Sequence, residues 1–219
     1  MERLICLVIG YVFGMFQTAY IYGKAYHIDI REHGSGNAGT TNALRTLGKK
    51  AGLIVFIGDL LKAVLASVVV RVIFRNTCAD SMTLLVLYTG LGTVLGHNFP
   101  AYLKFKGGKG IAATAGVVVS LGRWELIVAG LIFFILAVAI SRYVSVGSLV
   151  MVVSVFITFF ILDSMGRISG LTPRAVAYEA MAVFFIFVVL AFIRHKTNIV
   201  RLFKGTENKL SFKKKTEES

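Results

Sequence analysis

The chain has 219 residues, of which 56% are hydrophobic and only 16% are charged, and its mean hydropathy is +0.76. Soluble domains carry about 25% charged residues, so this composition excludes a soluble protein and indicates one that is embedded in lipid. Two cysteines are too few for the disulfide framework of a small secreted protein, and we do not expect Cys6 and Cys78 to pair.

Five apolar runs are close to the roughly 20 residues that a membrane-spanning helix needs. They cover residues 4–22, 52–70, 82–103, 143–162 and 175–193. The first run is not a cleavable signal peptide, because Gln17, Tyr20 and Tyr22 occupy the place of a small-residue cleavage site. The sequence therefore predicts an all-α polytopic membrane protein with a single domain over residues 1–219.

Residues 111–140 form a longer apolar stretch that residues 123–125 interrupt. If it forms two helices, one side of the membrane holds 17 lysines and arginines and the other 6, whereas a single helix gives 10 against 12. Cytoplasmic loops carry the excess of these residues, which favours seven transmembrane helices with the N-terminus outside and the C-terminus cytoplasmic. The basic tail, about residues 205–219, is expected to attract anionic lipid headgroups through the lysines at 213–215 rather than nucleic acid.

A polar segment over residues 34–42 consists only of Gly, Ala, Ser, Thr and Asn. It matches the G-x-G-x-x-G pattern of dinucleotide-binding proteins, but no strand precedes it and Asp59, twenty residues past Gly39, falls inside an apolar run. The glycines still allow backbone N–H groups to approach an anion, and Arg45 adds a planar fork suited to phosphate. The structural alternative is a glycine-rich connector between two helices.

Residues 106–110, Lys-Gly-Gly-Lys-Gly, lack the Gly-Lys-Ser/Thr ending of a Walker loop, so ATP hydrolysis is not expected. We expect the next helix to begin at the turn of Gly107 and Gly108 and to present its N-terminus, with Thr114 in the first turn, to an anion. A positively charged membrane anchor is the alternative. Non-helical backbone at membrane depth needs protein or water around it, so the loop predicts a polar cavity.

His195 and Asn198 follow the last apolar run at spacing i, i+3 and face one cavity if the helix continues. A histidine there can act as a general acid or base near neutral pH, although a snorkelling surface histidine is the alternative. His97 has a capping or a site-lining role. Asp59 and Lys62, also at i, i+3, are expected to form an intramembrane ion pair that supports the site.

Four groups of polar and glycine-rich residues follow one another along the chain. They are Gly34, Ser35, Gly36, Asn37, Gly39, Thr41, Asn42 and Arg45; Gly96, His97, Phe99 and Pro100; Lys106 to Gly110 with Ala112 and Thr114; and His195, Asn198, Ile199, Arg201, Leu202, Gly205 and Glu207. Over nearly the whole chain, this set resembles the bacterial acyl-phosphate:glycerol-3-phosphate acyltransferase family, an integral membrane family with seven spans.

The resemblance implies transfer of a fatty acyl group from acyl phosphate to the 1-hydroxyl of glycerol 3-phosphate. The products are 1-acyl-glycerol 3-phosphate, which is lysophosphatidic acid, and phosphate, and the step is the first of membrane phospholipid synthesis. It also implies a location in the bacterial inner membrane with the active site facing the cytoplasm, no metal or other cofactor, and a functional link to the soluble enzyme that makes acyl phosphate from acyl carrier protein.

With the resemblance, the motifs divide into three predicted roles. Catalysis is assigned to Ser35, Arg45, Lys109, His195 and Asn198; phosphate binding to Gly36, Asn37, Thr41, Asn42, Gly107, Gly108, Gly110 and, from the resemblance alone, Ser148; and support to Asp59, Lys62, His97, Thr114, Arg201 and Glu207. We favour direct transfer over an acyl-serine, because phosphate is a good leaving group and no carboxylate completes a triad. Either His195 or a substrate phosphate takes the proton.

The alternative function is a membrane transporter of phosphorylated metabolites, to which charged residues and glycine-broken helices within the membrane also belong. A transporter needs binding groups near the midplane and gates on both faces. In this sequence the polar motifs gather on one face, which favours the enzyme.

Overall fold

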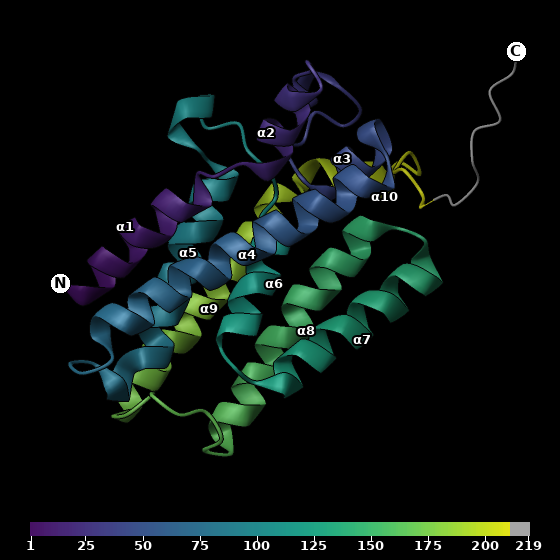
Figure 1. The fold of residues 1–219 in the computed structure, drawn as a ribbon. Helices are drawn as coiled ribbons and strands as arrows, with labels where there is room; N and C mark the ends of the chain where they lie inside the picture. Colours follow the sequence, from purple (N-terminus) through teal and green to yellow (C-terminus); the bar gives the residue numbers. More distant parts are fainter. Residues whose placement is uncertain (211–219) are drawn as a thin grey trace, which may run out of the picture.

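The structure is a computed structural model that describes residues 1–210; residues 211–219, with the three lysines of the predicted tail, lie outside the described part. Within residues 1–210 every regular element is a helix, as predicted. In chain order (Figure 1), the elements are α1 (Glu2–Gly14), α2 (Thr18–Ala25), η1 (Ile30–Glu32), α3 (Thr40–Leu47), α4 (Lys49–Phe74), η2 (Ala79–Ser81), α5 (Met82–Asn98), η3 (Ala101–Leu103), α6 (Ile111–Ser120), α7 (Trp124–Ser141), α8 (Val144–Ser164), α9 (Arg174–Arg194) and α10 (Lys196–Phe203).

Six helical stretches in the described chain are long and apolar enough to cross a membrane. They are Glu2–Ala25, Lys49–Phe74, Ala79–Leu103, Trp124–Ser141, Val144–Ser164 and Arg174–Arg194. The first confirms the span predicted over residues 4–22, but the helix within it is interrupted between Gly14 and Thr18. Buried Gln17 lies at the break and donates its side-chain amide to the carbonyl oxygens of Gly14 and His97, at 3.2 and 3.0 Å.

The stretch over residues 111–140 forms two helices, α6 and α7, as the two-helix interpretation predicts. Gly122 separates them with a φ of +68°, a conformation that favours glycine. Helix α6 begins at Ile111 rather than at Gly107, because Gly110 adopts a left-handed φ of +83° just before it. Its ten residues span about 15 Å at 1.5 Å per residue, so α6 reaches only part of the way through a bilayer.

Helices α1 and α5 contact each other backbone to backbone. A methyl group built on any of four glycines would overlap a backbone carbonyl of the opposite helix; these are Gly10 and Gly14 on α1 and Gly92 and Gly96 on α5. Small residues at this four-residue spacing let transmembrane helices approach closely. The packing holds the end of α5, where His97 lies, against the break between α1 and α2.

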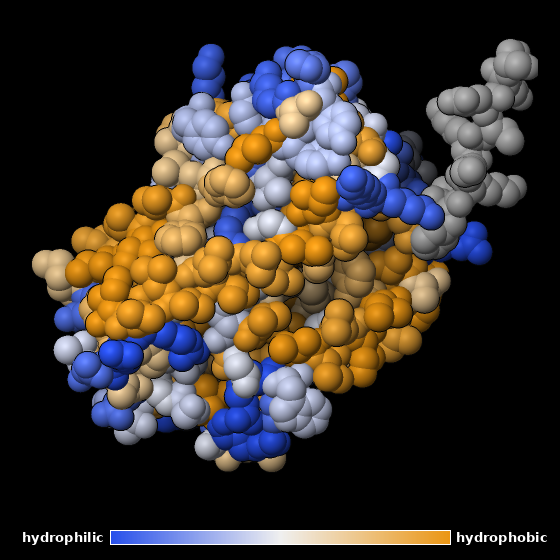
Figure 2. Space-filling model, in the orientation of Figure 1, coloured by the Kyte–Doolittle hydropathy of each residue, from blue (hydrophilic) through white to orange (hydrophobic). Residues whose placement is uncertain are grey.

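Apolar side chains cover the middle of the molecule on the outside as well as the inside. The largest internal cluster joins α5, α6, α8 and α9 and includes Leu87, Val117, Phe159 and Phe184. Figure 2 shows a broad hydrophobic band between two hydrophilic ends. This is the surface that a bilayer requires, and the chain is a multi-pass membrane protein. Cys6 and Cys78 are both free thiols.

Candidate active site

The polar motifs meet at one cavity of about 270 Å³. Its polar lining consists of Ser35, Asn37, Gly39, Thr40, Thr41, Asn42, Arg45, Asp59, His97, Lys109, Gly110, Ser145, Ser148, His195, Asn198, Arg201 and Glu207. Five of the predicted site residues do not line it: Gly36, Lys62, Gly107, Gly108 and Thr114. The residues that do line the cavity come from segments that lie far apart in the sequence.

Three helices begin at this cavity. Their first residues, Thr40 of α3, Ile111 of α6 and Val144 of α8, all line it. The first N–H groups of a helix have no partner within that helix, and together with the helix dipole they favour a bound anion. The N-termini of these three helices together form an anion-binding end of the cavity.

The charges of the lining side chains add to this effect. Arg45, Lys109 and Arg201 supply three cations. The two carboxylates are both engaged, since Asp59 pairs with Lys62 and Glu207 pairs with Arg201. The cavity is therefore suited to phosphate esters.

Asn42 holds the loop that presents Ser35. Its Oδ1 accepts a 2.8 Å hydrogen bond from the Ser35 N–H, and its Nδ2 donates to the carbonyl oxygens of Ile30 and His33 at 3.0 and 2.9 Å. Gly34 allows the turn, with a φ of +60° and no room for a methyl group beside Asn42. With its amide fully used, Asn42 positions the loop, while the Ser35 hydroxyl makes no hydrogen bond to residues 1–210 and is free to meet a ligand.

Gly107 and Gly108 lie behind the lining. Their N–H groups donate to the carbonyl oxygens of Asn98 and His97, at 3.2 and 3.0 Å. Their own carbonyl oxygens accept from the Arg194 guanidinium, at 3.2 and 2.8 Å. These amides are thus engaged within the protein rather than exposed to the cavity. Arg194 fixes the loop, a role that the sequence did not indicate.

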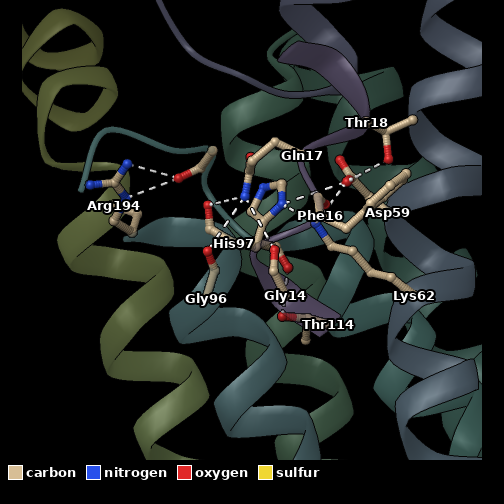
Figure 3. A network of polar contacts seen from close by, with 12 residues as sticks. Gly14, Phe16, Gln17, Thr18, Asp59, Lys62, Gly96, His97, Thr114 and Arg194 are labelled. Atoms are coloured by element: carbon tan, nitrogen blue, oxygen red, sulfur yellow. Dashed lines mark hydrogen bonds and ion pairs between the residues drawn. The ribbon is translucent and has the colours of Figure 1, made fainter. Parts of the chain in front are cut away.

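A buried network of polar contacts supports the same loop, and Figure 3 shows this network. The Lys62 ammonium donates to the carbonyl oxygen of Phe16 at 2.7 Å, to Oδ1 of Asp59 at 2.9 Å and to Nδ1 of His97 at 2.8 Å. Each of its three N–H groups therefore has an acceptor. Thr18 also donates to Asp59, at 3.2 Å. The predicted intramembrane pair exists, and it joins α4 to α5 and to the break after α1.

Asn198 connects two charged groups across the cavity. Its Oδ1 accepts a hydrogen bond from Lys109, and its Nδ2 donates to Oε1 of Glu207 at 2.7 Å. Glu207 also accepts from Arg201 at 2.7 Å and from Ser145 at 3.2 Å. Glu207 therefore ties the segment after α10 to the start of α8. Ser145 is a site residue that sequence reasoning missed, because nothing distinguishes it locally from other helical serines.

Two charged side chains of the cavity, Lys109 and Glu207, have shifted pKa values. Burial lowers the pKa of Lys109 to about 8, and the neighbouring arginines Arg201 and Arg194 act in the same direction against the attraction of Glu207. Burial raises the pKa of Glu207, but hydrogen bonds from Arg201 and Asn198 outweigh that effect and leave it below its ordinary value. At neutral pH Lys109 is mainly a cation and Glu207 an anion.

His195 lies at the junction between α9 and α10, so the helix does not continue through it unbroken. It is 2% exposed, and its Nδ1–H donates to the carbonyl oxygen of Ala191 at 2.8 Å. Nε2 is then the acceptor nitrogen. Burial and the positive charge of Lys109 lower the pKa of His195 to about 4, so the imidazole is neutral at pH 7.

Two predicted hydroxyl groups are engaged by their own helices. Ser148 lines the cavity and donates to the carbonyl oxygen of Val144 at 2.8 Å, and Thr114 donates to that of Gly110 at 2.9 Å. Each hydroxyl keeps its acceptor capacity. Among the described residues, no group of three or more His, Cys, Asp or Glu is arranged to hold a metal ion.

The other half of the cavity is apolar. It is lined by Phe56, Ile111, Ala112, Ala115, Leu131, Phe134 and Met151, from α4, α6, α7 and α8. Phe56 and Leu131 also belong to the exposed apolar surface, with exposed fractions of 39% and 57%. The apolar half therefore reaches the lipid-facing side. Apolar residues within apolar helices all look alike in a sequence, which is why this half was not predicted.

Comparison with known proteins agrees with this geometry. The sequence model of a family described as Glycerol-3-phosphate acyltransferase matches residues 4–205. Relatives named Glycerol-3-phosphate acyltransferase are 41% identical in Halalkalibacterium halodurans, over 96% of this chain and 97% of the relative, and 40% identical in Chlorobaculum tepidum, over 97% and 98%.

Two solved structures share the fold. One is the glycerol 3-phosphate form of PlsY (YgiH), an integral membrane glycerol 3-phosphate acyltransferase, with a TM-score of 0.80 and 29% identity over 96% of both chains. The other is the lysophosphatidic acid form of the same protein, with a TM-score of 0.78 and the same identity and coverage.

Proposed function

We propose, from the premise that this chain belongs to the glycerol-3-phosphate acyltransferase family, that its cavity transfers an acyl group from acyl phosphate to the 1-hydroxyl of glycerol 3-phosphate. The chain is a membrane acyltransferase acting on glycerol 3-phosphate. The acyl phosphate donor and the residue roles are the proposed part. The single observation that carries them is a cavity with an anion-binding half and an apolar half.

The anion-binding half accommodates the phosphates of both substrates. Arg45, Lys109 and Arg201 and the starts of α3, α6 and α8 surround it. Charge-assisted hydrogen bonds to phosphate are roughly twice as strong as neutral ones. The apolar half takes the acyl chain, and each buried methylene contributes about 0.8 kcal/mol. An acyl phosphate has these two parts in one molecule, and its carbonyl carbon then lies at the boundary between the halves.

We assign direct transfer to this arrangement. The hydroxyl oxygen of glycerol 3-phosphate attacks the acyl carbonyl carbon, the bond from that carbon to the phosphate oxygen breaks, and inorganic phosphate leaves. The Lys109 cation and the Ser35 hydroxyl stabilise the negative charge that develops on the carbonyl oxygen. Ser35 has no base within hydrogen-bonding distance among residues 1–210, which disfavours an acyl-serine.

The position of His195 suggests how the attacking hydroxyl is oriented. Its Nε2 accepts a hydrogen bond from that hydroxyl. With a pKa of about 4, the imidazole holds a proton weakly, whereas a phosphate monoester has a second pKa of about 6. The proton therefore goes to a substrate phosphate, and His195 fixes the geometry of attack. Asn198 and Glu207 keep Lys109 in place beside it.

The orientation in the membrane follows from the count of lysines and arginines, 17 against 6. We place the N-terminus outside and the cavity at the cytoplasmic face of the bacterial inner membrane, and we count the short helix α6, together with the loop before it, as a crossing additional to the six long spans. There the enzyme meets glycerol 3-phosphate and the acyl phosphate made from acyl carrier protein by a soluble enzyme. In protein with Cys78→Ser, a cysteine introduced at Gly205 should then react with a membrane-impermeant maleimide only in inverted vesicles, whereas native Cys78 should react from outside; reaction of the cysteine at 205 in sealed cells would reverse the orientation.

Phosphate release tests the reaction itself. Purified protein in detergent should release inorganic phosphate from palmitoyl phosphate only when glycerol 3-phosphate is present, and should form lysophosphatidic acid in equal amount. Palmitoyl-CoA should not replace the donor. Because a detergent solution has no second compartment, a transporter gives no such signal, and release without glycerol 3-phosphate would indicate a phosphatase.

A further inference from the structure

A second cavity lies at the opposite end of α4 from the active site. It is lined by Arg71, Arg75, Ala79, Met82, Thr83, Ser120, Leu121, Gly122, Ser169 and Gly170. Arg71 follows Asp59 by twelve positions on α4, a distance of about 18 Å along a helix axis. The second cavity is therefore separate from the active site, and no residue lines both.

The arginines at this end of the molecule fall into two groups. Four are paired with carboxylates: Arg3 with Glu179, Arg123 and Arg167 with Glu125, and Arg174 with Asp163. Arg71 and Arg75 have no carboxylate partner within residues 1–210, and both line the second cavity. Arg71 donates one hydrogen bond, to the carbonyl oxygen of Ser120 at 2.7 Å, and Arg75 donates none to the described chain. Two arginines without a carboxylate partner thus line one cavity that has no acidic lining residue.

The surroundings place this cavity at the level of lipid headgroups. Val72 and Ile73, next to Arg71 at the end of α4, are 61% and 53% exposed. Trp124, two residues past the cavity residue Gly122, is 67% exposed, and tryptophans concentrate at the boundary between membrane and water. An occupant of the cavity therefore has apolar surface beside it and water above it.

We propose that the second cavity binds the headgroup phosphate of an anionic phospholipid in the leaflet opposite the active site. A guanidinium group matches two phosphate oxygens at once, and two of them without a carboxylate favour a headgroup of net negative charge. A zwitterionic headgroup brings a cationic amine near the same arginines. The acyl chains of the lipid lie along the exposed apolar side of α4.

The test is native mass spectrometry of the detergent-solubilised protein. Wild-type protein, Arg75→Gln and the matched control Arg167→Gln are each titrated with dioleoyl phosphatidylglycerol, with dioleoyl phosphatidylcholine and with inorganic phosphate. Arg167→Gln also removes one arginine charge at this end, while Glu125 keeps Arg123 as its partner. Acyltransferase activity, measured on the same samples, verifies that each variant is folded.

We expect wild type and Arg167→Gln to retain phosphatidylglycerol, and Arg75→Gln to bind it about tenfold more weakly, the effect of one charged hydrogen-bond partner. Equal retention in Arg75→Gln and wild type overturns the proposal, as does equal binding of phosphatidylcholine. If inorganic phosphate saturates the protein at the same concentration and displaces the lipid, the occupant is a soluble anion and the proposal is overturned. Arg75→Lys, which keeps the charge without the fork, should bind more weakly than wild type but more tightly than Arg75→Gln.

Discussion

Nζ of Lys62 lies 2.8 Å from Nδ1 of His97, and this contact fixes the imidazole so that its Nε2 is directed at Gly108. A methyl group built on Gly108 would overlap Nε2 of His97 and approach the carbonyl oxygen of Ala38. Ala38 precedes α3, so the glycine lets two of the motifs and the buried network meet at one point. The glycine is required for close packing.

Gly108→Ala should therefore lower both the stability and the activity of the enzyme. Overpacking of this kind costs about 1–3 kcal/mol, and the displaced loop also moves Lys109. Thermal unfolding in detergent and steady-state kinetics with both substrates measure the two effects. Lys106→Ala, an exposed change in the same loop, should leave the unfolding midpoint unchanged. If Gly108→Ala unfolds and turns over like wild type, the loop has more freedom than the structure gives it.

Lys109 should set the alkaline limit of catalysis. Its pKa is lowered to about 8, so the cation is present below that pH and is lost above it. We expect kcat/KM for acyl phosphate to fall above about pH 8, and the limb of kcat to lie higher because bound phosphate favours the charged lysine. In Lys109→Arg, whose side chain stays charged, this limb should disappear even if the rate is lower. If kcat/KM of Lys109→Arg still falls above about pH 8, another titrating group sets the alkaline limit.

His195 should remain neutral under conditions that protonate an ordinary histidine. Burial and the charge of Lys109 lower its pKa from 6.5 to about 4, so the folded protein takes up no proton at His195 between about pH 6.5 and pH 4. NMR of protein labelled at histidine, with His195→Asn to assign the signal, should show no titration of His195 above pH 5. A midpoint near 6.5 would restore it as the acceptor of the proton.

Ser35 should act without becoming acylated. Ser35→Ala removes a donor to the developing oxyanion, which lowers kcat by about tenfold to a thousandfold. Acyl phosphate alone should give wild-type enzyme no burst of phosphate and no covalent label. An acyl-enzyme that glycerol 3-phosphate discharges, and that Ser35→Ala abolishes, would replace direct transfer by a two-step mechanism while leaving the overall reaction intact.

Ala115 should limit the length of the acyl chain that the apolar half accepts. Ala115→Leu adds bulk to the lining on α6, so kcat/KM for palmitoyl phosphate should fall about tenfold relative to that for decanoyl phosphate, the effect of one to two methylenes displaced. Val119→Leu, one turn further along α6 and 38% exposed, adds a methylene outside the cavity and serves as the control. Equal loss for both donors would place the chain elsewhere.

The sequence predicts the helices and the meeting of the motifs because both depend on local information. The length of the apolar runs predicts the membrane spans. The excess of lysine and arginine on one side predicts that residues 34–42, 106–110 and 195–207 lie on the same side of the membrane. The orientation of Asn42 depends on carbonyl oxygens at Ile30 and His33, and these appear only once the loop has closed. Its role as a holder of the loop was therefore not predictable.

Contacts across the sequence account for the other differences. Arg194 reaches the carbonyl oxygens of Gly107 and Gly108 from 87 and 86 residues away, and Ser145 meets Glu207 from 62 residues away. No periodicity or composition encodes such pairs. The break after Gly14 likewise depends on carbonyl oxygens of α5, which the buried amide of Gln17 reaches only in the folded bundle.

The glycine interface between α1 and α5 has a consequence for biosynthesis. Helix α1 ends at residue 14 and α5 at residue 98, so about 80 residues are synthesised between them, which takes roughly 4 to 16 s at 5–20 residues per second. During that interval the glycine face of α1 lacks the helix against which it packs in the folded protein. The contact between the first and the third membrane span therefore cannot form until the third span has been synthesised.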